Sequence, residues 1–163
     1  MSRFRPPIRR KGDGFVIDLG NNETDVLLRL IDELRTLLTD DKPDPAAAAL
    51  TARLFPVVHR DDAAMEAEYQ RLMRDELVQS KLSALLQMET ALGGNGRVDE
   101  GQLLAFMQAV NSIRLVLGVM LGISDDDSAD QLDEISDLAE THEQMLYHYL
   151  SWILEWTVRA QTG

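Results

Sequence analysis

Three histidines are the side chains of this chain best suited to metal or acid–base chemistry. His142 and Glu143 begin like the zinc-protease motif, in which a second histidine four residues later shares one helical face, but position 146 is leucine. His148 follows His142 by six residues, nearly on the opposite side of a helix. None of these histidines, nor His59, follows a glutamate by the three residues that di-iron bundles use. We therefore expect surface or partly buried imidazoles and no metal site.

An acidic stretch runs from Asp125 to Glu143, with nine carboxylates and no lysine or arginine. Its beginning resembles a calcium-binding loop, but such a loop needs glycine at its sixth position and glutamate at its twelfth. Those positions hold Asp130 and Ser136. Two interpretations remain: a solvated loop and helix face, or a surface that docks a basic partner.

Other catalytic motifs are missing. Gly12-Asp13-Gly14 precedes a strand and lacks a third glycine, so it indicates a turn and not a phosphate site. The chain contains no nucleophile-elbow, Walker or kinase signature. It also contains no cysteine, which excludes disulfides, thiolate metal sites and thiol redox switches. We expect a protein that is not an enzyme and uses no cofactor.

Five positive charges and no acid fall within the first 11 residues, which we call the basic arm. They are Arg3, Arg5, Arg9, Arg10 and Lys11. The remaining residues carry 11 basic and 28 acidic side chains. The arm therefore either grips nucleic acid or an acidic partner, or lies on the acidic surface of its own chain.

Trp152 and Trp156 stand four residues apart, on one side of the last predicted helix. Aromatic pairs at this spacing serve in packing or form a ridge that binds a partner. Both interpretations stay open.

Arg114 and Asn111 lie within an otherwise apolar helix. A buried guanidinium needs a carboxylate or several carbonyls. We expect both residues to be buried structural groups, with an acid such as Asp75, Glu76 or Glu155 paired to Arg114. A small anionic ligand is the alternative.

Helical periodicity dominates the chain beyond a short β-hairpin. Residues 4–19 form the predicted hairpin, with an edge strand after Pro6 and Pro7. Leucines and isoleucines at three- and four-residue spacing predict a helix that is capped by Asn21 or Asn22 and reaches Leu38. Asp44 and Pro45 predict a second helix to about residue 54.

The second half predicts longer helices. Asp61 or Asp62 caps a segment to residue 92, as one helix or as two divided near Asp75. Asp99 caps a helix at 100–121 that is apolar nearly all round and ends at Gly122, so it should run through the middle of a bundle. The last helix begins near residue 130 or 136 and reaches about 160.

These elements predict an all-α fold: a single-domain helical bundle with a central apolar helix and a small N-terminal β-hairpin. The 163 residues, 45% of them hydrophobic, suit one domain, with the arm and hairpin at 1–20 and the bundle at 22–160. Residues 103–121 contain four polar side chains, so they predict a core helix and not a membrane span. No export signal follows the first basic residues, and we expect a cytoplasmic protein.

Four segments together carry a family resemblance. The first is residues 111–118 (NSIRLVLG), with LGI at 121–123. The others are Phe4-Arg5; Glu68-Tyr69 and Leu72 with Arg74-Asp75; and Tyr147-x-x-Leu150-x-Trp152-x-x-x-Glu155. They resemble an actinobacterial family, long uncharacterised, whose members are now named after the oxidative-stress regulator AosR, and the first segment resembles its hallmark segment.

The resemblance implies a small cytoplasmic regulator that acts in transcription during oxidative stress, through contact with the transcription machinery. Genes of the family commonly lie beside that of the ClpS adaptor, which implies a second context in Clp proteolysis. The family's redox role depends on a cysteine pair, and this chain has none.

Together these observations predict a non-enzymatic interaction protein that lacks the cysteine switch. A DNA-binding regulator that uses the basic arm is the alternative, and an adaptor for proteolysis is the third. We expect a protein partner, no membrane association and no sequence-specific DNA binding by the chain alone; a homodimer is compatible with the sequence.

Overall fold

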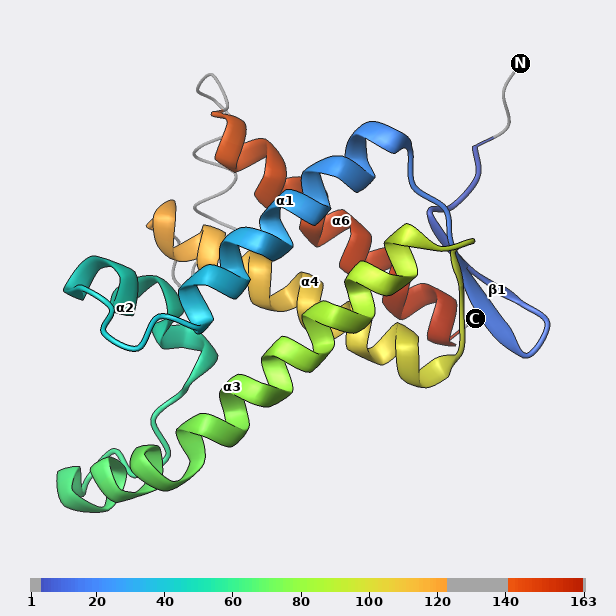
Figure 1. Cartoon of the computed structure of the whole chain (residues 1–163). Coiled ribbons are helices and arrows are strands. Elements are labelled where there is room, and N and C mark those ends of the chain that lie inside the picture. The colour runs from blue at the N-terminus through green and yellow to red at the C-terminus, as the bar shows by residue number, and fades with distance from the viewer. Residues whose placement is uncertain (1–3, 123–140, 163) are drawn as a thin grey trace.

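The computed structural model describes residues 4–122 and 141–162. The fold is all-α with a small sheet at one end, as predicted (Figure 1). The helices are α1 (Asn21–Leu38), α2 (Pro45–Thr51) with the short 3₁₀ helix η1 (Ala52–Leu54), α3 (Ala63–Gly93), α4 (Glu100–Met120) and α6 (His142–Thr162). The strands are β1 (Ile8–Lys11), β2 (Gly14–Ile17) and β3 (Arg97–Val98).

Helix α4 runs through the centre of the bundle, which confirms the prediction from its composition. It packs mainly against α3 and α6, and Leu103, Phe106 and Val110 are fully buried. By length and composition α4 is apolar enough to cross a membrane, but 56% of its most apolar stretch is buried inside the fold, as in the core helix of a soluble protein. Asp99 caps its first turn by accepting a hydrogen bond from the Gln102 N–H at 2.7 Å. Gly122, at φ +73°, follows its last turn as predicted.

The predicted hairpin is present, but the sheet has a third strand that we did not predict. β1 pairs antiparallel with β2 through a two-residue turn in which Gly12 has φ +62°. β3 pairs with the other edge of β2, placing Val98 beside Phe15 and Arg97 beside Val16. A strand of two residues has no detectable periodicity, so nothing in the sequence pattern marked it. β1 is an edge strand, as its prolines indicated.

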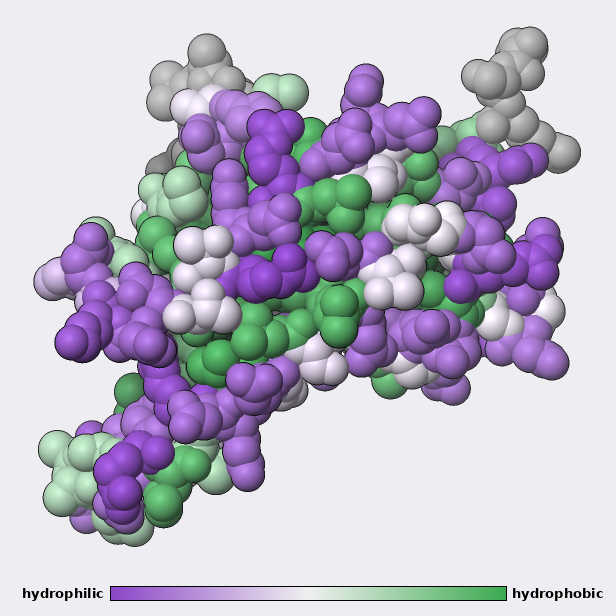
Figure 2. Space-filling view, in the orientation of Figure 1, coloured by the Kyte–Doolittle hydropathy of each residue, from purple (hydrophilic) through white to green (hydrophobic). Residues whose placement is uncertain are grey.

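The segment between residues 62 and 92, left open as one helix or two, forms the single helix α3. Asp62 caps it by accepting a hydrogen bond from the Met65 N–H at 3.1 Å. Asp75 is exposed on the helix surface and does not interrupt it. The N-terminal part of α3 projects away from the body of the molecule (Figures 1 and 2).

Two helix starts differ from the expected ones. The residue before α1 is Gly20, whose N–H donates to the side chain of Glu23, so Asn21 and Asn22 are already helical. Before α6, Thr141 and Gln144 exchange hydrogen bonds between side chain and backbone. The starts near residues 130 and 136 lie outside the described residues.

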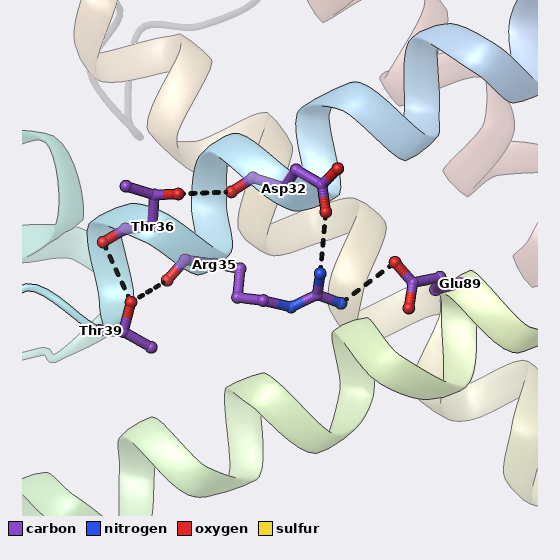
Figure 3. Close-up of polar contacts among 5 residues, drawn as sticks. All are labelled: Asp32, Arg35, Thr36, Thr39 and Glu89. Carbon is purple, nitrogen blue, oxygen red and sulfur yellow. Dashed lines mark hydrogen bonds and ion pairs between the residues drawn. The ribbon is translucent and has the colours of Figure 1, made fainter.

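Helices α1 and α3 are joined over an apolar seam by one arginine. Arg35 donates to Asp32 at 2.8 Å on its own helix and to Glu89 of α3 at 3.3 Å (Figure 3). Hydrophobic residues line the seam between the two helices, flanked by hydrophilic ones (Figure 2). Because these charges are about one-third to two-thirds exposed, the ion pairs contribute at most about 1 kcal/mol, and the buried leucines of α1 supply most of the stabilisation.

Candidate interaction surfaces

Trp152 and Trp156 lie on one side of α6 within a longer stripe of exposed and half-buried side chains. Met145 and Tyr149 precede them at the same three- and four-residue spacing, and Phe4 packs on Trp156 with ring centroids 5.6 Å apart. We call these five residues the aromatic ridge. Met145, Trp152 and Phe4 are 57%, 39% and 67% exposed, so the ridge is not closed over by the bundle.

The opposite side of α6 holds the ridge in place. Its buried residues face the body of the fold, where α6 contacts α4 and β1. These residues are Tyr147, Leu150, Ile153, Thr157 and Ala160. The Thr157 hydroxyl donates to the Ile153 carbonyl at 2.8 Å, which satisfies a fully buried polar group. Packing of this side therefore fixes the position of the helix that carries the ridge.

Tyr149 is the most constrained member of the ridge. Its ring lies against Trp152 with centroids 6.0 Å apart, and its hydroxyl is buried without a hydrogen-bond partner. Burial raises the pKa of Tyr149 well above its ordinary value, and the negative charge of Glu23 adds to the shift. Tyr149 therefore stays neutral at any physiological pH.

The basic arm is divided between contacts with its own chain and exposed charges. Arg3 lies outside the described residues. Arg9 pairs with Asp18 at 3.1 Å, and Arg10 donates to the Gln161 carbonyl at 3.2 Å. Arg5 and Lys11 are exposed. Each of the two interpretations thus describes part of the arm.

The pairing of β3 with β2 places Arg97 beside the basic arm, which the sequence analysis did not predict. Alternation along the strands places Arg9, Lys11 and Arg97 on the outer face of the sheet, because Arg9 and Arg97 both lie opposite Val16. Lys11 and Arg97 line a shallow hollow of about 180 Å³ together with Gly14. We missed Arg97 because the strand that carries it was not predicted.

Arg114 does not form the ion pair that we expected. Its Nη2 donates to Asn111 Oδ1 at 2.9 Å, and its guanidinium lies 5.7 Å from the centre of the Tyr147 ring. Glu155 is paired instead with Arg159 at 2.7 Å.

The other two expected partners, Asp75 and Glu76, lie exposed on α3. No carboxylate among the described residues pairs with Arg114, and its buried Nε lacks a hydrogen-bond partner. Asn111 and Arg114 are half-buried, and the Asn111 amide oxygen and the Tyr147 ring take the place of the acid.

The titratable residues considered for metal chemistry are scattered. His59 packs edge-on against Tyr69, with ring centroids 5.8 Å apart, far along the chain from His142 and His148 on α6. Within residues 4–122 and 141–162, no three His, Asp or Glu side chains gather as a metal site. Most of the acidic stretch from Asp125 to Glu143 lies outside the described residues.

Sequence reasoning also missed an apolar groove between α1, α2 and α4. It has a volume of about 390 Å³, and apolar side chains form most of its wall. They are Leu30, Leu34, Leu37, Leu50, Ile113, Val116, Leu117 and Met120. Each has the spacing of a core residue, so periodicity alone does not distinguish a filled seam from an open one.

A second hollow of about 190 Å³ continues this groove toward the start of α6. Both hollows are lined by Leu30, Glu33, Leu117 and Met120. The second also reaches Arg29, His142, Glu143 and Leu146. We call the two together the α1–α4 groove.

Comparison with known proteins gives one match. The model of a family described as "Domain of unknown function (DUF2017)" matches residues 1–161. No curated protein and no solved structure is significantly similar to the chain.

Proposed function

Since the chain belongs to the DUF2017 family, whose description states no activity, we propose a function from its surfaces: it is a non-enzymatic regulatory protein that acts by contact with another protein. The aromatic ridge carries the proposal. Tryptophan, tyrosine, phenylalanine, methionine and arginine are the side chains enriched at protein interfaces. The ridge combines four of these types, with Arg159 stacked over Trp156 at 5.0 Å.

Two physical features favour a binding role over a purely packing role. The ridge leaves the large apolar side chains of Phe4, Met145 and Trp152 exposed to water, which folding alone does not require. Its side chains are also held by the buried side of α6, so binding would cost little side-chain entropy.

The context that we propose is the one implied by the resemblance to the AosR-like family: a small cytoplasmic regulator whose partner belongs to the transcription machinery. This chain has no cysteine, so the proposed role is contact without the thiol switch.

Affinity capture from the native cell, with a matched pair of variants, tests the role of the ridge. Trp152→Ser removes the centre of the ridge, whereas Val158→Ser removes an apolar side chain, 49% exposed, from another face of α6. We expect the protein retained by wild type at physiological salt to be retained by Val158→Ser and lost with Trp152→Ser. Equal retention by both variants would show that the ridge is not the contact.

DNA binding by the basic arm is the second candidate, favoured by the shared outer face of Lys11 and Arg97. Net charge opposes it, because specific recognition needs a coherent cationic face and the chain carries −12. We expect only weak, salt-sensitive DNA binding without sequence preference. Titration against promoter and scrambled fragments at physiological salt tests this, and affinity of about 10⁻⁸ M or tighter for one sequence alone would favour the second candidate.

A further inference from the structure

The α1–α4 groove is an open surface with mostly apolar walls. Leu30 and Leu37 remain half-buried, and Met120 is 54% exposed. A cavity of about 150 Å³ already holds a benzene molecule. The main part of the groove, at about 390 Å³, therefore has room for more than one bulky side chain.

The shape of the groove suits an elongated occupant. The main hollow begins at Leu50 of α2, and the second ends at Leu146 of α6, with Leu117 and Met120 of α4 between them. An amphipathic helix presents apolar anchors along one face at three- and four-residue spacing, and such a row fits a trough of this kind. A compact ligand would occupy one hollow and leave the other open.

The charges at the groove favour an occupant whose polar side is basic. Glu33 lines both hollows and Glu143 lies at the α6 end, against the single arginine Arg29. Glu33 forms no ion pair with any described residue. The whole chain carries −12. A helix with lysine or arginine beside its apolar face complements this surface.

We propose that the α1–α4 groove is a docking site for a basic amphipathic helix of a partner protein. The proposal rests on the proposed function, since it assumes that the chain works by protein contact, but it assigns that contact a second surface, separate from the aromatic ridge. The apolar anchors of the helix enter the two hollows, and its basic residues meet Glu33 and Glu143.

A designed peptide tests the groove without knowledge of the partner. The probe is a fluorescent 18-residue peptide of leucine and lysine in amphipathic order, and its control is the same composition in scrambled order. At physiological salt we expect the amphipathic peptide to bind at least about tenfold more tightly than the scrambled one. Equal binding of the two peptides would overturn the proposal, because general attraction to an acidic protein would then suffice.

Variants with matched controls locate the binding. Met120→Trp fills the groove, whereas Leu104→Trp adds the same side chain at a 42% exposed position of α4 outside it. Glu33→Lys reverses a charge in the groove, whereas Asp25→Lys reverses an exposed charge of α1 elsewhere. We expect each groove variant to weaken binding about tenfold and each control to stay within about twofold. Unchanged binding in both groove variants would overturn the proposal.

Two further measurements keep the result interpretable. Circular dichroism checks folding, and Thr36→Trp, an exposed position at the same groove, replaces Met120→Trp if that variant fails to fold. Trp152→Ser should leave peptide binding unchanged. Failure of the wild type to capture any protein, with intact peptide binding, would therefore count against the ridge and the proposed function, whereas capture without peptide binding would count against the groove alone.

Discussion

Nη2 of Arg114 lies 2.9 Å from Oδ1 of Asn111, one turn earlier on the central helix. The Arg114 guanidinium also lies over the face of the Tyr147 ring, and it has no carboxylate partner among the described residues. Because its buried Nε remains without a hydrogen bond, this guanidinium contributes little to the free energy of unfolding.

The first prediction follows from that arrangement. Arg114→Met should change the free energy of unfolding by less than about 1 kcal/mol, since it removes an unsatisfied donor and keeps the packing of the stem. Asn111→Leu should cost more, because it leaves the arginine without its partner. Urea unfolding of both variants measures the difference, and a larger loss for Arg114→Met would show that the arginine makes a stabilising contact that we have not identified.

The second prediction compares two adjacent leucines of α4. Leu103 is 0% exposed and Leu104 is 42% exposed. Leu103→Ala should cost about 2–5 kcal/mol through the cavity that it leaves, whereas Leu104→Ala should cost roughly 1 kcal/mol or less. Equal losses in urea unfolding would contradict the burial assigned to the central helix.

The third prediction concerns two glycines with positive φ. Gly96 has φ +80°, and a Cβ there would collide with the Ile17 carbonyl, whereas Gly12 has φ +62° with open space around it. Gly12→Ala should therefore cost only the backbone strain, about 1 kcal/mol, while Gly96→Ala should cost at least about 2 kcal/mol and weaken the docking of the hairpin. Thermal unfolding of the pair measures this, and similar midpoints would mean that the β2–β3 contact yields easily.

The fourth prediction is a local pH dependence at Glu66. Hydrogen bonds from the His59 N–H, the Gln70 amide and the Val58 N–H lower the pKa of Glu66 below its ordinary value of 4.5. A lowered carboxyl pKa stabilises the fold above the unfolded-state value, and that contribution is lost as pH falls through the folded-state value.

The amide proton shifts of Val58 and His59 in an NMR titration should accordingly show a carboxylate transition with its midpoint below 4.5. In Glu66→Gln they should not titrate, because that side chain is neutral at every pH. A midpoint above 4.5 in the wild type would contradict the assignment.

The sequence predicted helices well where the helical spacing of apolar residues and a capping residue indicated the same start. Asp44 with Pro45, Asp62 and Asp99 each begin a helix, because a carboxylate that accepts the free N–H groups of the first turn is a local interaction. The predicted cap of α1 was one or two residues too late, because Glu23 reaches back to Gly20 and a glycine before a helix is a weaker signal than an asparagine.

The candidate surfaces were only partly predictable, for a different reason. The spacing of Trp152 and Trp156 indicated one side of a helix, but their exposure depends on which side of α6 the bundle covers. Arg97 joined Lys11 through a strand pairing between distant segments, and the groove depends on how closely α1, α2 and α4 approach. Distances between elements are set by how their side chains pack, and the spacing of residues within one segment gives no information about those distances.

The pairing of β2 with β3 also bears on the order in which the chain acquires its structure. The hairpin leaves the ribosome early, but its central strand stays half-paired until Arg97 and Val98 emerge after the whole of α3. Ile8 and Phe15, almost fully buried in the finished fold, are solvent-exposed during that interval. A nascent chain stalled before residue 97 thus presents a short, basic, apolar hairpin to its surroundings, and β1 is covered only when α6 packs against it.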